Sequence, residues 1–532
     1  MITRFALMSL LAMYFWIVDL LFRFFNFWFR RRRLVDTPSD ELLFLSAARL
    51  TEYIRTRELT ASYLIDAYIA RIQHVNGALN AMILDNFSEA RLEAERIDEY
   101  LEDIDINSEE YLNLPQTKPL LGIPFTVKNN IYVKGFVCTA GVPARISEPP
   151  CRQDAEAVRR LRDAGAILIG ITNVPELGLW WETSNRLFGI TRNPYDLRRT
   201  AGGSSGGESA LLAAGASVLG LGNDVGGSLR IPPAFCGIYG LKPSPGLVPS
   251  KDVFPVITGG YVETMATAGP MCRYADDLAP FLRVLVGNDV ADNVLRIDQP
   301  VDLRKIRIFY MEGINSPFCE PLHYEVREAL RKVVKYFEKR YDRPTHRLDL
   351  PLAHHALQMY LTSLDEDSIL HVREALTNYK SKLNPFIELA KHLVGASAHT
   401  LPAIMTALHC TLPQPNAAER GFVNSKRDQL RVELSNLLGE DGILLFPSFP
   451  TLPPYINQPL TAPFNFAYSA LWSAVALPAL ICPIGMNRAE TLPLSVQIIA
   501  APNAERLLIA CARDLEEGFG GWVVPHSHHR FF

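Results

Sequence analysis

Glycine and serine are concentrated in one short block of this 532-residue chain, and the block constrains the backbone more than any other segment. Residues 201–230 read AGGSSGGESALLAAGASVLGLGNDVGGSLR, and twelve of the 33 glycines lie between positions 202 and 246. Glycine has no Cβ, so it permits tight turns and lets backbone N–H groups approach a bound group closely. The clusters at 202–207 and 226–228 can therefore surround one point with hydroxyls and amide donors, as acyl transfer at a serine requires.

Histidine, the usual partner of a nucleophilic serine, is missing around this block: none of the 12 histidines lies between His74 and His323. A Ser-His-Asp triad is assembled in space, so the gap does not exclude one, but nothing local supports it. Residues 202–206 match GxSxG, which taken alone points to Ser204 as nucleophile, although the polar segment before it is not a strand. No GxxxxGK[ST] pattern is present, so the block is not a phosphate loop.

One lysine ends an apolar segment upstream of the block. The segment LLGIPFTVKNN (120–130) predicts a short buried strand that ends at Lys128, and AILIGITN (166–173) predicts another strand after a helix at 154–165. The Lys128 side chain then either packs its aliphatic stem against the protein and extends its ammonium group into the solvent, or is buried as a whole. Burial without a carboxylate partner would lower its pKa from about 10.4 to about 7–8 and make it a base.

Alternating strands and helices predict an α/β fold in which an extended sheet is covered by helices. No Gly/Ser-rich or Pro-rich linker and no repeat interrupts residues 40–525, so residues 35–532 are expected to form one domain. The small, apolar run at 208–222 predicts a tightly packed helix that begins beneath the serines.

Composition excludes several partner classes. Lys and Arg number 53 against 57 Asp and Glu, and no basic cluster stands out beyond the amino terminus, so nucleic acid is not an expected partner. The eight cysteines are scattered without a CxxC pair, which predicts reduced side chains on a cytosolic face. His526, His528 and His529 near the end lack further ligands, so neither a metal nor another cofactor is expected.

Residues 1–34 differ in composition from the rest of the chain. An uncharged run from Phe5 to Val18 is followed by Asp19, Arg23 and an aromatic stretch that ends at Phe29. As a helix, this segment spans about 37 Å at about 1.5 Å per residue, enough to cross a hydrocarbon core of about 30 Å. Asp19 and Arg23 are four residues apart and neutralise one another in part.

This composition predicts an uncleaved single-pass anchor, because large aromatic residues rather than small ones follow the apolar run. A helix lying in the membrane interface is the main alternative. Arg30–Arg33 after the segment, against Arg4 alone before it, predict that the following domain is cytoplasmic.

Three motifs in a fixed order carry a family resemblance. Lys128, GGSSGG at 202–207 and DVGGSLR at 224–230 together resemble the amidase signature family, over residues from about 40 to the end. A finer match, to fatty acid amide hydrolases of the single-anchor kind, is carried by NPYDL (193–197), LKPSPGLVPS (241–250), GPMCRYADDLAP (269–280) and PFNFAYSA (463–470).

The resemblance implies the α/β amidase signature fold, with one large mixed, twisted β-sheet surrounded by helices, and a Ser-Ser-Lys triad. Ser228 is then the nucleophile, Ser204 a bridging serine whose peptide bond to Gly203 is cis, and Lys128 the base. The implied oxyanion donors are the backbone N–H groups of Val225, Gly226, Gly227 and Ser228, and the implied supporting residues are Ser205, Asp224 and Arg230.

The resemblance further implies hydrolysis of long-chain fatty acid amides, such as oleamide and N-acylethanolamines, at an endomembrane such as the ER or a lipid droplet. Leu179, Trp180 and Trp181 are candidates for lining an acyl chain and equally for the core. The segment 385–409 has helical periodicity and either dips into a membrane or lies on the surface. Alternatives are an amidase of small polar amides, a glutamine-dependent amidotransferase subunit, and an inactive lipid-binding scaffold. Pairing into a homodimer is left open.

Overall fold

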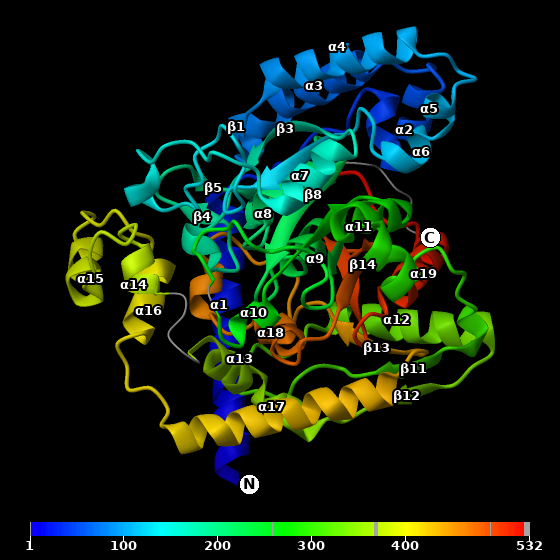
Figure 1. Ribbon diagram of the computed structural model, residues 1–532. Helices are drawn as coiled ribbons and strands as arrows, with labels where there is room; N and C mark the ends of the chain where they lie inside the picture. The colour runs from blue at the N-terminus through cyan, green and yellow to red at the C-terminus, as the bar shows by residue number, and fades with distance from the viewer. Residues whose placement is uncertain (1, 258, 366–370, 490, 526–532) are drawn as a thin grey trace.

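A computed structural model describes residues 2–257, 259–365, 371–489 and 491–525. Its centre is an 11-stranded sheet with helices around it, which confirms the predicted fold class (Figure 1). The strand order is β1 (Met82–Asp85), β3 (Ile167–Thr172), β2 (Pro124–Lys128), β8 (Leu219–Asp224), β10 (Thr267–Cys272), β9 (Tyr239–Lys242), β14 (Ala479–Met486), β15 (Pro493–Ala500), β13 (Gly442–Pro447), β11 (Arg307–Tyr310) and β12 (Thr345–Arg347). The predicted histidine tail lies outside the described residues.

The sheet is mixed, and its inner strands are mostly apolar because helices cover both of their faces. β2 runs parallel to β3 and β8, whereas β10 runs antiparallel to β8. Every residue of β2, β3, β10 and β13 is buried. Strands buried on both faces read as continuous apolar runs rather than alternating ones. Two small hairpins lie outside the main sheet: β4 (Ser184–Asn185) with β5 (Gly189–Ile190), and β6 (Arg192–Asn193) with β7 (Asp196–Thr200).

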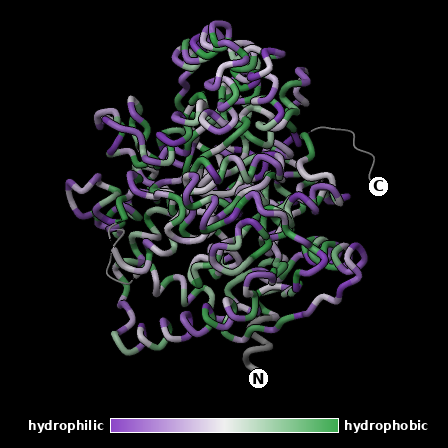
Figure 2. The backbone as a smooth tube through the Cα atoms, turned by 45° about the vertical axis from the view of Figure 1, so that its right-hand side comes forward, coloured by the Kyte–Doolittle hydropathy of each residue, from purple (hydrophilic) through white to green (hydrophobic). Residues whose placement is uncertain are grey.

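The helices are mostly amphipathic and cover the sheet. Along the outer pair α3 and α4, at the top of Figure 2, purple and green alternate, as expected for helices with one buried face. The helices after α1 are α2 (Ala47–Arg55), α3 (Ala61–Leu79), α4 (Phe87–Asp103), α5 (Glu109–Leu112), α6 (Leu114–Thr117), α7 (Glu156–Asp163), α8 (Gly206–Ala213), α9 (Ile231–Cys236), α10 (Val262–Met265), α11 (Leu278–Val286), α12 (Tyr324–Tyr341), α13 (Ala356–Asp365), α14 (Val372–Ala375), α15 (Pro385–Leu393), α16 (Leu401–His409), α17 (Ala417–Leu438), α18 (Ala467–Ala474) and α19 (Glu505–Phe519).

The predicted helix over 208–222 is wrong in its second half. α8 ends at Ala213, and the chain turns at Gly215, whose φ of 69° is in the left-handed region, before β8 begins at Leu219. The break brings β8 into the sheet between β2 and β10. One glycine-serine cluster precedes α8 and the other follows β8, and the reversal of the chain between them brings both to the same end of this helix–strand unit.

The amino-terminal helix α1 (Ile2–Phe29) lies against the rest of the chain. Gln458 donates to the Asp19 carboxylate at 3.3 Å, and the Tyr14 hydroxyl donates to the Thr461 carbonyl at 3.3 Å. Phe15 is buried, but most of the large apolar side chains of α1 from Leu10 onward are exposed. Among the described residues, Ser9–Phe29 is the one stretch apolar and long enough to cross a membrane.

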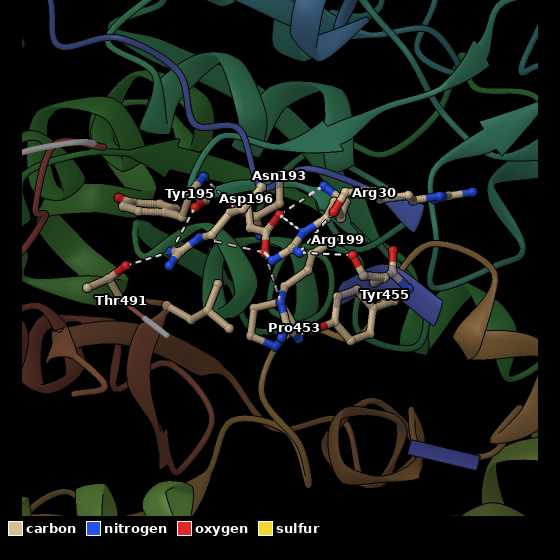
Figure 3. Close-up of polar contacts among 12 residues, drawn as sticks. Arg30, Asn193, Tyr195, Asp196, Arg199, Pro453, Tyr455 and Thr491 are labelled. Carbon is tan, nitrogen blue, oxygen red and sulfur yellow. Dashed lines mark hydrogen bonds and ion pairs between the residues drawn. The ribbon is translucent and has the colours of Figure 1, made fainter. Parts of the chain in front are cut away.

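Part of the basic flank after α1 is bound to the body of the protein around Asp196 (Figure 3). Asp196 of β7 forms ion pairs with Arg32 at 3.8 Å, Arg198 at 2.8 Å and Arg199 at 3.5 Å. Arg32 also donates to Thr491 at 2.6 Å. The basic flank therefore fixes the carboxyl end of α1 to the 193–199 hairpin.

Candidate active site

Three residues far apart in the sequence form one hydrogen-bonded chain. The Lys128 ammonium nitrogen lies 2.7 Å from the Ser204 hydroxyl, which in turn donates to the Ser228 hydroxyl at 2.7 Å. Lys128 is the last residue of β2, and Ser228 follows β8, so the parallel pairing of these strands brings both to the same sheet edge. Ser204 precedes α8, and its peptide bond to Gly203 is cis, as the family resemblance implied.

Lys128 is buried, with 1% of its surface exposed, so the alternative of a lysine reaching water is wrong. Burial lowers its pKa to about 7, against the opposing charges of Asp224 and Glu208. Its nitrogen also contacts the Asn223 side-chain oxygen at 2.7 Å. Because the pKa lies near 7, a large share of the molecules carries a neutral amine at neutral pH, and a neutral amine can accept a proton.

Glu208 of α8 was not anticipated from the sequence. It is fully buried, and Thr126 and Thr172 donate to its two oxygens at 2.5 and 2.7 Å. Burial raises its pKa to about 8, so it is mostly neutral at pH 7 and does little to hold a proton on Lys128. The available signal was a lone charged residue inside the run GGESALLAAG, which is otherwise uncharged.

A buried ion pair lies beneath the loop that carries Ser228. Asp224 and Arg230 are fully buried, and two guanidinium nitrogens each contact a carboxylate oxygen at 3.0 Å. Burial alone would raise the pKa of Asp224, but the charge and hydrogen bonds of Arg230 outweigh it and hold the pKa below its usual value. Arg230 also donates to the Ser469 carbonyl and the Ser473 hydroxyl of α18. The pair fixes the loop to α18.

Breaking this pair is expected to destabilise the fold strongly. Replacing Arg230 with methionine leaves the Asp224 charge buried without its partner, which costs about 3–5 kcal/mol. The free energy of unfolding in urea measures the loss. Arg91→Met is the matched control, because its ion pair with Asp66 is exposed and is worth about 0–1 kcal/mol. Equal losses in the two variants would contradict the prediction.

One of the four expected oxyanion donors is already occupied. The Gly227 N–H donates to Asp224 at 2.7 Å, so the expectation for Gly227 is corrected. The N–H groups of Val225, Gly226 and Ser228 have no acceptor within the described part of the chain. Gly227 has a φ of 138°, and a Cβ there would lie 2.7 Å from Ser469. Only glycine fits this position, and its conformation turns the N–H toward the buried carboxylate.

Ser205 does not form the expected supporting hydrogen bond with any residue that the structure describes. Its buried hydroxyl has no hydrogen-bond partner among the described residues. Ser205 is the residue before α8, and its hydroxyl packs against the backbone of Gly222 in β8. Glycine at position 222 offers no polar side chain there, so Ser205 fills space between helix and strand.

The Ser204–Ser228 pair opens into a cavity of about 830 Å³. The acyl-chain candidates Leu179, Trp180 and Trp181 all line it. On other sides the wall is formed by residues of α13 and α16, including Tyr360 and Met405. The predicted helical segment 385–409 is therefore two helices, of which α16 lines the cavity. Among the described residues no group of three or more His, Cys, Asp or Glu side chains could hold a metal ion.

Comparisons with known proteins agree with this geometry. The family model described as amidase matches residues 63–509. Fatty-acid amide hydrolase 2 of Homo sapiens is 38% identical over 494 residues, which cover 92% of this chain and 91% of that protein. Fatty-acid amide hydrolase 2-B of Danio rerio is 39% identical over 512 residues, 95% of each chain.

A solved structure titled fatty acid amide hydrolase has the same fold, with a TM-score of 0.69 at 20% identity, covering 90% of this chain and 86% of that one. The family match spans most of the chain, and the two relatives exceed a third identity over nearly their full length. The chain therefore belongs to the amidase family.

Proposed function

We propose that this protein is a membrane-attached serine amidase that hydrolyses long-chain fatty acid amides to the free acid and the amine. The observation that carries the proposal is the hydrogen-bonded chain from Lys128 through Ser204 to Ser228, which begins at a buried lysine and opens into a largely apolar cavity. The names of the relatives support the amide bond and the fatty acid as parts of the substrate.

The proposed reaction begins when neutral Lys128 takes a proton from Ser204 and Ser204 takes one from Ser228. The Ser228 oxygen then attacks the amide carbonyl carbon. The resulting oxyanion accepts hydrogen bonds from the backbone N–H groups of Val225, Gly226 and Ser228. Each donor of this kind typically contributes about 10²–10³ in turnover.

The same relay then runs in reverse. Lys128 returns its proton through Ser204 to the leaving nitrogen, the carbon–nitrogen bond breaks, and the amine departs. An amide needs this protonation because an amide anion is a very poor leaving group. Water next attacks the acyl ester on Ser228 with the relay acting as base again, which releases the fatty acid and restores the serine.

The acyl chain is proposed to lie along Leu179, Trp180 and Trp181. Each methylene that it buries contributes about 0.8 kcal/mol to binding. Aromatic residues suit this role, since they offer a large rigid apolar surface. The Trp181 indole is held in place by donating to the Pro463 carbonyl at 3.2 Å.

Membrane attachment is proposed through α1, with residues 1–34 as the anchor and residues 35–532 as a cytoplasmic catalytic domain at an endomembrane. Exposed apolar side chains support this proposal. α1 presents many of them, and the neighbourhood of α15 and α16 presents Phe386, Ile387, Leu393, Val394 and Met405. α16 contributes both to this apolar surface and to the cavity wall, which suits a substrate taken up from lipid.

A substrate panel tests the proposed function. Purified protein is assayed with oleamide, anandamide, an N-acyl taurine, acetamide and glutamine. We expect kcat/KM to rise with acyl length by up to about fourfold per buried methylene, the equivalent of about 0.8 kcal/mol. Ser228→Ala serves as the blank. Preference for acetamide or glutamine would instead favour a small-amide amidase or an amidotransferase subunit, and absence of any hydrolysis would favour a lipid-binding scaffold.

A further inference from the structure

Tyr360 presents a hydroxyl to the cavity that holds Ser228. It lies on α13, has 7% of its surface exposed, and lines the cavity wall. Its ring packs edge-on against Phe466, with the two ring centroids 5.3 Å apart, and this contact holds the side chain in place. The Tyr360 hydroxyl forms no hydrogen bond with a described residue, and, unlike the Ser205 hydroxyl, it keeps surface that is accessible from the cavity.

The same hydroxyl packs against the loop that carries Ser228. A Cβ placed on Gly226 would collide with the Tyr360 hydroxyl and would lie 2.7 Å from the ring carbon that bears it. The φ of Gly226 is outside the left-handed region, so its backbone conformation does not by itself require glycine. Glycine at this position therefore makes room for the hydroxyl beside the backbone. The N–H of Gly226 is one of the proposed oxyanion donors.

The Tyr360 hydroxyl is protonated and can act as a donor. Burial and the nearby charge of Asp224 raise the pKa of Tyr360 above its ordinary value, against the opposing charge of Arg230. The hydroxyl therefore keeps its proton throughout the pH range in which Lys128 titrates. The one strong acceptor in a primary fatty acid amide is the carbonyl oxygen, because the nitrogen lone pair is delocalised into the carbonyl group. A donor on this wall of the cavity matches that oxygen.

We propose that the Tyr360 hydroxyl is a catalytic oxyanion donor, which donates a hydrogen bond to the substrate carbonyl oxygen beside the Gly226 N–H. This inference rests on the proposed function, because it needs attack by Ser228 on a carbonyl carbon. As the bond to Ser228 forms, the carbonyl oxygen gains negative charge, and the hydrogen bond from Tyr360 strengthens. Tyr360 keeps its own proton throughout. It supplies a fourth donor in place of the Gly227 N–H, which Asp224 already occupies.

The variant Tyr360→Phe tests this role, since it removes the hydroxyl and keeps the ring. We expect kcat for oleamide to fall about 10²-fold, the typical loss for one oxyanion donor, while KM changes by less than about threefold. Fluorophosphonate labelling of Ser228 should slow by a similar factor, because the phosphonyl oxygen takes the place of the carbonyl oxygen. The urea midpoint of unfolding should stay at its wild-type value, because the hydroxyl has no partner in the fold to lose.

Tyr261→Phe is the matched control. Tyr261 lies outside the cavity lining, and its hydroxyl donates to the Ala474 carbonyl at 2.7 Å. This variant loses a hydrogen bond of the fold, so its urea midpoint should fall while its kcat and labelling rate stay at wild-type values. The two tyrosine variants are therefore expected to give opposite results in the two measurements.

A second substrate locates the donor on the substrate. N-oleoylethanolamine has the acyl chain and carbonyl group of oleamide and carries an additional hydroxyl on its amine part. If Tyr360 binds the carbonyl oxygen, Tyr360→Phe should reduce kcat for the two amides by the same factor.

The outcomes separate this inference from the proposed function. Unchanged kcat and labelling in Tyr360→Phe, or a rise in KM alone, overturns the role of Tyr360 as an oxyanion donor while leaving the amidase intact. A loss confined to N-oleoylethanolamine also overturns it and assigns the hydroxyl to the amine part of the substrate. If wild type hydrolyses neither amide, the proposed function fails, and the labelling rates of wild type and Tyr360→Phe decide the inference. If wild type is not labelled either, the inference fails as well.

Discussion

Replacing Lys128 with methionine is expected to abolish turnover at neutral pH and, at the same time, to stabilise the fold. General base catalysis contributes about 10²–10⁴ to a rate, and residues of a relay act as a unit, so we expect kcat/KM to fall by at least about 10³. Methionine has nearly the length of the lysine stem and carries no charge. The variant therefore separates what the amine does for catalysis from what it costs in stability.

The stability effect follows from the direction of the pKa shift. Burial lowers the pKa of Lys128 from 10.5 in the unfolded chain to about 7 in the fold. Between these two values the unfolded chain binds a proton that the fold does not bind, so the stability of wild type rises with pH across this window. The cost of burying the lysine is therefore largest at pH 7 and below, and it disappears near pH 10.5.

Methionine removes this cost but leaves Ser204 and Asn223 without their contact to the amine. At about 1.36 kcal/mol per pKa unit, minus the lost hydrogen bonds, we expect a net gain of about 1–3 kcal/mol at pH 7. Urea unfolding at pH 7 and pH 10 measures it, and the gain should shrink at pH 10. Wild-type kcat/KM should rise with pH through about 7, as the amine loses its proton.

Lys242 provides a matched control. It is fully buried, burial lowers its pKa to about 7, and it donates to the Leu477 carbonyl at 3.0 Å away from the serines. Lys242→Met should show a similar pH-dependent gain in stability and keep its activity. If Lys128→Met retains turnover, or if both variants lose it equally, Lys128 is not the base.

The residues of the relay could be predicted because each stands at a local break in the sequence pattern. Lys128 ends an apolar strand, and Ser204 and Ser228 each follow a pair of glycines. Breaks of this kind are visible without knowledge of the tertiary structure. The resemblance then assigned their order, which residue spacing alone left open between Ser204 and Ser228.

The environment of the relay could not be predicted in the same way. That the Gly227 N–H donates to Asp224 and that Glu208 is mostly neutral both depend on how distant segments pack. The boundary between α8 and β8 was missed for a different reason. A short run of small apolar residues suits a buried helix and a buried strand equally, and only Gly215 marked the change.

The contacts of α1 are a third kind of feature beyond the sequence. An almost uniformly apolar segment has no periodicity that identifies one buried face. Its polar residue Asp19 accepts a hydrogen bond from Gln458, more than 400 positions away in the chain. The sequence could predict a segment able to enter a membrane, but not which face of that helix contacts the catalytic domain.

Removing the Ser228 hydroxyl is expected to have the largest effect on activity of any single change. Ser228→Ala should reduce turnover by a factor on the order of 10⁶, as expected when a covalent nucleophile is lost, and should abolish labelling by a fluorophosphonate. Ser204→Ala keeps the nucleophile but breaks the chain between Lys128 and Ser228. Its turnover should fall by about 10³, and its labelling should be slowed rather than lost.

The difference between these two variants distinguishes the nucleophile from the bridging serine. The GxSxG pattern at 202–206, taken alone, points to Ser204 rather than Ser228 as the nucleophile. Ser205→Ala is the control, because this neighbouring serine is equally buried and its hydroxyl has no partner among the described residues. Its labelling rate should match wild type. Labelling that survives in Ser228→Ala and disappears in Ser204→Ala would show that Ser204 attacks the substrate. In that case Lys128, whose nitrogen lies 2.7 Å from the Ser204 hydroxyl, would take the proton from Ser204 directly, and Ser228 would not be part of the relay.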